Sequence, residues 1–157
     1  MFSQTAEYAL RVVVYLASLN DRPATLARIA NATQIPAGYL AKVCAELSRN
    51  QIIKTQRGLH GGSQLARSAE SISVYDVIHA VDPIRRIETC PLGLKNHGVN
   101  LCPLHKRLDD AIASVAQAFQ ASTIAELVAD PSPSKPLGEI STIPASGLVS
   151  MKVLRKG

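Results

Sequence analysis

The feature that most constrains the fold of this chain is a run of three helical segments followed by a glycine-turned hairpin. The helical segments, defined by apolar residues at helical spacing, span about 3–20, 25–33 and 36–49, and Thr25 is the expected N-cap of the second. Two strand-like runs, 51–56 and 63–67, flank a turn that contains three glycines, which suit backbone of positive φ. This order predicts a mainly α fold with a small β-hairpin wing, which is a winged helix-turn-helix.

Three more helices are predicted downstream of the hairpin. One opens near Ser73, where Ser73 and Asp76 resemble a capping box, and ends near Pro83. A last short helix spans about 124–129 behind a capping box of Thr123 and Glu126. Between them, apolar residues along one face predict a long helix over 104–121. Such an apolar stripe is too extensive to remain exposed to solvent on a small protein, so we expect this helix to form a dimer interface.

Positive charge is concentrated around the predicted reading helix and wing. Residues 22–67 contain seven Lys and Arg side chains and one acid, Glu46, whereas the whole chain has a net charge of +5. This pattern favours the phosphates of double-stranded DNA, and a dimer would read a palindromic operator. The expected DNA-binding residues are Arg28, Ala37, Gly38, Tyr39, Lys42, Arg49, Lys54, Arg57 and His60.

Two of the three cysteines and two of the four histidines lie within residues 88–105. The first residues lack the basic segment of a signal peptide, and no apolar run is long enough to span a bilayer. We therefore expect a cytoplasmic protein without a membrane partner. An odd number of cysteines argues against a disulfide scaffold, so we expect the thiols to serve as ligands, in redox chemistry or in the core. The expected core thiol is Cys44, on the buried stripe of the third helix.

These features divide the chain into four expected parts. They are a winged helix-turn-helix DNA-binding domain (1–82), a cysteine-containing sensor loop (83–103), a dimerisation helix with a short C-terminal helix (104–130), and a flexible tail rich in Pro and Ser (131–157).

Several motifs together resemble the Rrf2 family of bacterial regulators over about residues 1–130. They are Tyr8-Ala9-Leu10-Arg11, Ile35-Pro36 with Tyr39-Leu40, Arg57-Gly58 with Gly61-Gly62, Tyr75-Asp76-Val77-Ile78, and the loop with Cys90 and Cys102. The resemblance implies a homodimeric winged-helix DNA binder, often with an iron–sulfur cluster that tunes its DNA affinity. The family includes regulators of iron–sulfur assembly, nitric-oxide sensors and regulators of cysteine metabolism.

The resemblance also implies a set of cluster ligands. Cys90 and Cys102 match the outer two of three evenly spaced cysteines, and Asn96 occupies the middle position. His97 is adjacent to that position, and His105 matches a histidine ligand of the assembly regulators. Glu7 matches a carboxylate that nitric-oxide sensors donate from the partner subunit. The implied cofactor is a 2Fe-2S or 4Fe-4S cluster.

The resulting hypothesis is a transcriptional regulator, with repression the expected sign, that senses redox, nitric oxide or iron–sulfur status. One alternative is the same regulator without a cluster, switched by thiol oxidation or by a protein partner. Zinc in a Cys/His site is another alternative for the loop. An enzyme that uses a Cys/His pair is a remote alternative, because a proline follows each loop cysteine and no acid orients a base.

Overall fold

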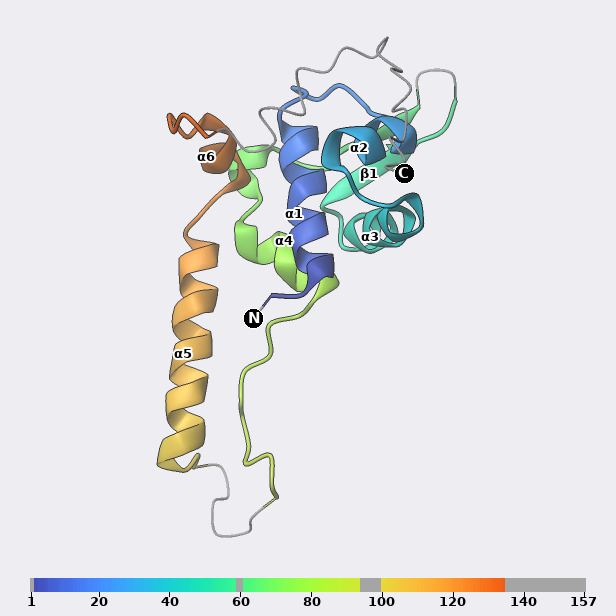
Figure 1. Cartoon of the computed structure of the whole chain (residues 1–157). Helices are drawn as coiled ribbons and strands as arrows, with labels where there is room; N and C mark the ends of the chain where they lie inside the picture. Colours follow the sequence, from blue (N-terminus) through green and yellow to red (C-terminus); the bar gives the residue numbers. More distant parts are fainter. Residues whose placement is uncertain (1, 59–60, 94–99, 135–157) are drawn as a thin grey trace, which may run out of the picture.

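The computed structural model describes residues 2–58, 61–93 and 100–134 (Figure 1). Its central element is helix α1 (Gln4–Ala17), which begins at Ser3, whose hydroxyl accepts a hydrogen bond from the backbone N–H of Ala6. Buried residues of α1 contact helices α2, α3, α4 and α6 and the wing. The core of the winged-helix body is therefore built around this first helix.

The helix-turn-helix is formed by α2 (Leu26–Thr33) and α3 (Ala37–Arg49). The Thr25 hydroxyl caps α2, as the sequence predicts, and Gln34 ends that helix in the left-handed conformation with a φ of 56°. Ile35 is then buried, and Pro36 occupies the N-cap of α3. Cys44 lies on the buried stripe of α3, and its predicted core position is confirmed.

The wing consists of strands β1 (Ile53–Gln56) and β2 (Gly62–Leu65), which pair antiparallel with Ile53 opposite Leu65. On its other side, β2 forms a bridge to Ala24, with two backbone hydrogen bonds of 2.8 and 2.9 Å between Ala24 and Ser63. A Cβ on Gly62 would lie only 2.7 Å from the Ala24 carbonyl carbon. Gly62 therefore permits the close approach that joins the wing to the helix-turn-helix.

The predicted reason for the wing glycines is only partly right. Gly58 has a φ of 116°, as a positive-φ turn requires. At Gly61, by contrast, the constraint is space, because a Cβ there would overlap the Gln56 carbonyl oxygen. The sequence also gave no sign of the short 3-10 helix η1 (Ala69–Ser71) that follows the wing.

Two capped helices pack against α1 and complete the body. The starts of α4 (Val74–Val81) and α6 (Ile124–Ala129) both have Ser/Thr capping boxes, as predicted. Ser73 and Thr123 form an antiparallel bridge, and Ile124 is fully buried in the core. The last short helix, which follows the long helix in the chain, thus packs within the winged-helix body.

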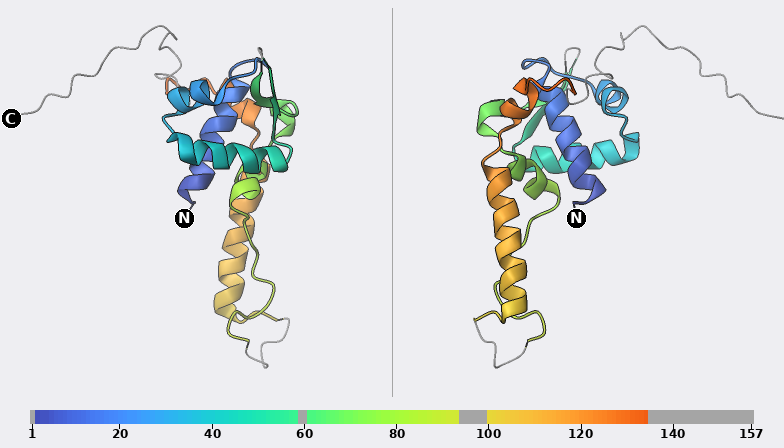
Figure 2. Two further views of the ribbon diagram at one scale, coloured as in Figure 1. Left: turned by 90° about the vertical axis from the view of Figure 1, so that its right-hand side faces the viewer. Right: turned by 60° about the vertical axis from the view of Figure 1, so that its left-hand side comes forward.

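Helix α5 (Pro103–Gln120) extends away from this body as an arm, and residues 83–93 run beside it in the opposite direction (Figures 1 and 2). Its 18 residues make it about 27 Å long. No helix in the described part of the chain is long and apolar enough to cross a membrane. The predicted mainly α fold with a β-hairpin wing and a long helix is confirmed, whereas most of the predicted tail, 135–157, lies outside the described residues.

Candidate nucleic-acid interface and candidate metal centre

The N-terminal end of α3 presents four of the predicted DNA-binding residues on one exposed surface. Ala37, Gly38 and Lys42 are exposed, and the ring of Tyr39 is 58% exposed although it is large and aromatic. No atom lies within 4 Å of where a Cβ on Gly38 would be. Small side chains beside an exposed tyrosine and lysine suit close approach to a groove floor and contact with phosphates or base edges.

Helix α1 supports this end of α3 through an aromatic and cationic cluster. The Tyr8 and Tyr39 rings meet edge to face with centroids 6.2 Å apart. The Arg11 guanidinium lies 5.7 Å from the Tyr8 ring, and its Nη1 donates a 3.1 Å hydrogen bond to the carbonyl of Thr33 at the end of α2. Arg11 therefore joins α1 to the end of α2, while Tyr8 joins α1 to the start of α3, and sequence reasoning missed both roles.

The other five predicted DNA-binding residues lie in three different settings. Arg28, Lys54 and Arg57 are exposed on α2, on β1 and beside the wing turn. Arg49, at the opposite end of α3, forms a 2.6 Å ion pair with Glu46. His60 lies outside the described residues. The predicted DNA-binding cations outside this pair therefore belong to α2, the start of α3 and the wing.

At the start of α5, a thiol and an imidazole are in contact. Cys102 is the N-cap residue of α5, and its Sγ lies 3.3 Å from Nδ1 of His105, one helical turn later. Cys90, on the other side of the loop, is buried, and its carbonyl accepts a 2.9 Å hydrogen bond from Gly93 in a tight turn. By contrast, burial in the body raises the pKa of Cys44 to about 11, so that this thiol stays protonated at neutral pH.

The predicted ligand Glu7 lies far from this thiol within one protomer. Its carboxylate is exposed on α1 and accepts a 2.7 Å hydrogen bond from Arg11. The Phe2 and Phe119 rings, 5.1 Å apart, place the start of the chain beside the C-terminal end of α5, about 25 Å along the helix from Cys102. Glu7 can therefore approach a thiol site only in a second subunit.

Among the predicted metal ligands, the structure brings Cys102 and His105 together. Within residues 2–58, 61–93 and 100–134, no three Cys, His, Asp or Glu side chains gather as a metal site. His97 lies outside these residues. Completion of a four-ligand site thus requires a ligand beyond those that the described residues of one chain bring together.

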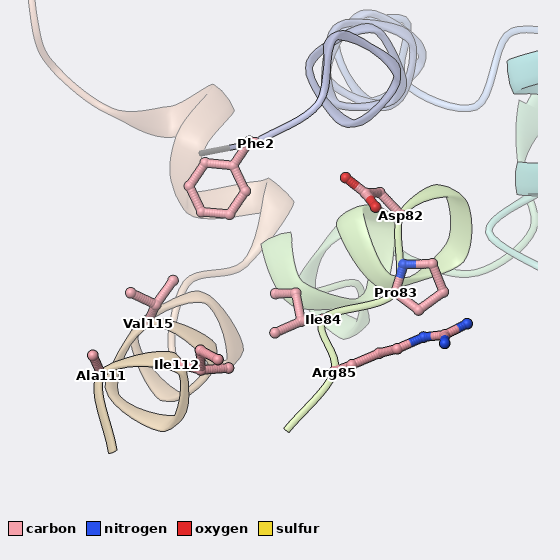
Figure 3. Close-up of a pocket in the computed structure, with 8 residues that line it drawn as sticks. All are labelled: Phe2, Asp82, Pro83, Ile84, Arg85, Ala111, Ile112 and Val115. Atoms are coloured by element: carbon pink, nitrogen blue, oxygen red, sulfur yellow. The ribbon is translucent and has the colours of Figure 1, made fainter. Parts of the chain in front are cut away.

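The arm carries apolar side chains that a single chain leaves uncovered. None of the described residues of α5 is buried, and Leu104, Leu108 and Val115 are 63, 49 and 37% exposed. Between α5 and residues 82–85 lies a groove of about 320 Å³, where Phe2, Ile84 and Ile112 face a common space (Figure 3). This apolar surface of α5 and the groove has the character of a subunit interface that lacks its partner.

Comparison with known proteins identifies the family. Residues 2–130 match the family model Rrf2, described as an iron-dependent transcriptional regulator. A curated protein of Aquifex aeolicus (strain VF5), assigned as an HTH-type transcriptional regulator, is 30% identical over 131 residues, which cover 82% of this chain and 91% of that protein. The enzyme alternative is thereby set aside, since these relatives are DNA-binding regulators.

Solved structures agree in fold. T. potens IscR superimposes with a TM-score of 0.69 at 21% identity, covering 84% of this chain and 88% of that chain. CymR, the global cysteine regulator of B. subtilis, superimposes with a TM-score of 0.65 at 22% identity, covering 81% of this chain and 95% of that chain. Staphylococcus aureus CymR gives 0.62 at 25% identity with 80 and 95% coverage. The chain belongs to the Rrf2 family of DNA-binding transcriptional regulators.

Proposed function

We propose that this protein is a homodimeric repressor that senses redox, nitric oxide or iron–sulfur status through a 2Fe-2S or 4Fe-4S cluster. Cys90, Cys102 and His105 would hold the cluster. The observation that carries this proposal is the 3.3 Å contact between Cys102 Sγ and His105 Nδ1 at the start of the arm helix. The description of the matched family as iron-dependent supports it.

The donor set has the chemistry that a cluster requires. Thiolates are the usual cluster ligands, and imidazole replaces them at some positions. The Cys102 side chain makes no capping hydrogen bond within α5, so it remains available as a ligand. His97, or Glu7 of the partner subunit, would complete the set. When bound, the cluster would supply an iron centre whose ligation and charge change on reaction with oxidants or nitric oxide.

The arm offers a route from this site to the DNA-reading surface. Helix α5 runs directly into the bridge between Ser73 and Thr123, and the next residue, Ile124, is fully buried against the core. A change in the orientation of α5 would therefore alter how two bodies are spaced in a dimer. Such a change favours one DNA-binding state over another, which a switch requires.

Dimerisation would cover the apolar face of α5. The leucines at 104 and 108 lie in the N-terminal half of this helix, whereas the groove at Ile112 and Val115 lies toward its C-terminal half. Two arms that cross antiparallel would bring the leucines of each protomer to the groove of the other, as two-fold symmetry allows.

Removal of a cation from the reading surface is expected to weaken DNA binding. Lys42→Ala should lower operator affinity about tenfold or more in a dimer, because two copies of the contact are lost. Arg57→Ala should also lower the affinity and reduce the slope of log affinity against log salt by about 2, since each lost phosphate contact contributes about 0.9. Fluorescence anisotropy over a salt series measures both effects.

The matched control is Lys106→Ala, which removes the same charge from the exposed face of the arm, where Lys106 pairs with Asp110. This variant is expected to bind DNA as the unmodified protein does. Unchanged affinity and salt slope in both Lys42→Ala and Arg57→Ala would show that this face does not contact DNA.

Gly38→Ala is expected to separate stability from DNA binding. A Cβ at this position meets no neighbouring atom, so alanine should raise the free energy of unfolding by about 0.5–1 kcal/mol. If α3 enters the major groove closely, the same methyl group should lower operator affinity about fivefold. Urea denaturation and anisotropy test the two effects, and a variant that is both more stable and fully active would argue against close approach at Gly38.

The sensing role is tested by comparing one anaerobic preparation before and after its iron is removed by a chelator. Operator affinity is expected to change at least about tenfold, which lies within the range of typical allosteric coupling between two sites. Identical affinities of the iron-loaded and iron-free protein would refute a sensing cluster.

A thiol switch without iron is the second candidate function. It is favoured by Asn96 at the position between Cys90 and Cys102, and by a 25% identical relative, S. aureus CymR, for which the structure of an oxidised form has been solved. On this alternative, DNA affinity responds to oxidant in protein that holds no iron, and Cys102→Ala removes that response.

A further inference from the structure

A carboxylate on α5 joins this helix to residues 83–93, the segment that runs beside it. Asp109 accepts hydrogen bonds from Nε and Nη2 of Arg86, at 2.6 and 2.5 Å, and from the backbone N–H of Ile87 at 2.9 Å. The Asp109 side chain is only 13% exposed. We call this arrangement, formed by Arg86, Ile87 and Asp109, the arm clamp. Bidentate charged pairs of this kind fix both distance and orientation.

The arm clamp lies only a few residues from each of the two loop thiols. Cys102 precedes Asp109 by seven residues of α5 and its N-cap, which is about 10 Å along the helix axis. Cys90 follows Ile87 by three residues, which span at most about 10 Å when extended. The two segments run antiparallel (Figure 1), so each thiol lies on the outer side of the clamp and within about 10 Å of it along the arm.

We propose that Asp109 is a positioning residue for the sensor, which sets the register between residues 83–93 and α5 and so keeps Cys90 within reach of Cys102 before any metal binds. The inference deepens the proposed function and rests on it for the purpose of the thiol pair. Without the clamp, the part of the arm beyond the groove at Ile84 and Ile112 would be closed by the 11 residues between the thiols, and bringing the thiols together would cost loop-closure entropy.

The clamp is permanent under physiological conditions. The hydrogen bonds from Arg86 and then from Ile87 lower the pKa of Asp109 to about 2. A carboxyl whose pKa is depressed by folding contributes its stabilisation above its ordinary pKa and loses it only as the pH falls through the folded value. Asp109 is therefore charged throughout the physiological range, and the clamp acts as a fixed brace.

The test measures thiol proximity in the full chain after its metal has been removed and its cysteines reduced. The bifunctional reagent dibromobimane fluoresces when it bridges two thiols, and peptide mapping identifies the bridged pair. Wild-type protein is expected to form the Cys90–Cys102 bridge readily. Asp109→Asn and Arg86→Gln are each expected to form it at least about threefold more slowly, because the loop closure is no longer prearranged.

The matched control is Asp110→Asn, which removes the same charge from the next residue, an exposed partner of Lys106. This variant should bridge its thiols at the wild-type rate, and equal circular dichroism spectra would exclude unfolding as the cause of any difference. Equal bridging in Asp109→Asn, Asp110→Asn and wild type would overturn the proposal, as would failure of wild type to bridge.

Iron content of the same variants separates this inference from the proposed function. One outcome is that wild type holds no iron while its thiols bridge fast and those of Asp109→Asn bridge slowly. That result would support the positioning role of Asp109 and contradict the proposed cluster. If wild type holds iron and the clamp variants bridge as fast as wild type, the cluster stands and the positioning role of Asp109 is wrong.

Discussion

Replacement of Cys102 by alanine is expected to abolish cluster binding and to remove the effect of iron on DNA affinity. Cys102 would supply one ligand at the start of the arm helix, where it lies in contact with His105. Loss of one metal ligand typically costs far more affinity than loss of a neighbouring hydrogen bond, and second-sphere changes alone cost about 10- to 100-fold. Cys90→Ala should have the same result, whereas His105→Ala should weaken or alter the cluster.

The matched control is Cys44→Ala, which also removes one thiol. Cys44 is buried in the body, and its raised pKa of about 11 keeps it protonated and unsuitable as a ligand. This variant should retain the cluster and the DNA response, with some loss of stability from the cavity. Iron analysis and operator binding of the four variants provide the measurement. Equal iron content in Cys102→Ala and Cys44→Ala would contradict the ligand assignment.

Ile112→Glu is expected to dissociate the dimer. Ile112 lines the groove between α5 and residues 82–85 (Figure 3), and a second α5 is expected to cover it. A carboxylate buried there without a partner should weaken dimerisation by about 3 kcal/mol or more, which is a factor of at least about 100 in the dissociation constant. Because Ile112 is only partly buried within one chain, the isolated body should remain folded.

Gln117→Glu is the control for this prediction, since it places a new carboxylate on an exposed position of the same helix. Sedimentation equilibrium should show a dimer for the unmodified protein and for Gln117→Glu, and a monomer for Ile112→Glu. DNA affinity should fall with dissociation, because half of the contacts would be lost. A monomeric unmodified protein would contradict the proposed assembly.

Much of the fold is predictable from the sequence because local signals and packing agree. The capping boxes that begin at Ser73 and Thr123 form as predicted, and the apolar stripes of α1 and α3 face the core. The predicted start and end of each helix are less accurate. The first helix ends at Ala17 rather than near residue 20, because Asn20 and Asp21 adopt positive φ in the following turn.

Features that depend on distant contacts were not predictable. The close approach of Gly62 to Ala24 joins segments that are far apart in the sequence. The contact of Arg11 with the Thr33 carbonyl and the pairing of Arg86 with Asp109 likewise depend on how elements pack. Charged residues in helices and loops are commonly solvated, so sequence spacing alone does not distinguish these from any others.

The candidate site shows the same division. The family resemblance paired Cys102 with His105, three residues later, and because α5 begins at Pro103 this spacing brings the two side chains into contact. The distance of Glu7 from the thiols follows from the direction of the arm, which becomes apparent only in three dimensions (Figure 2). The assignment of Glu7 of the partner subunit or His97 as the remaining ligand stays a prediction.

The most direct test of the sensor is the absorption spectrum of the unmodified protein purified without oxygen, together with its iron and sulfide content. The account predicts a brown protein with absorbance between roughly 320 and 460 nm from thiolate-ligated iron, lost in Cys102→Ala and retained in Cys44→Ala. A colourless protein that still holds no iron after anaerobic reconstitution with iron and sulfide would contradict it.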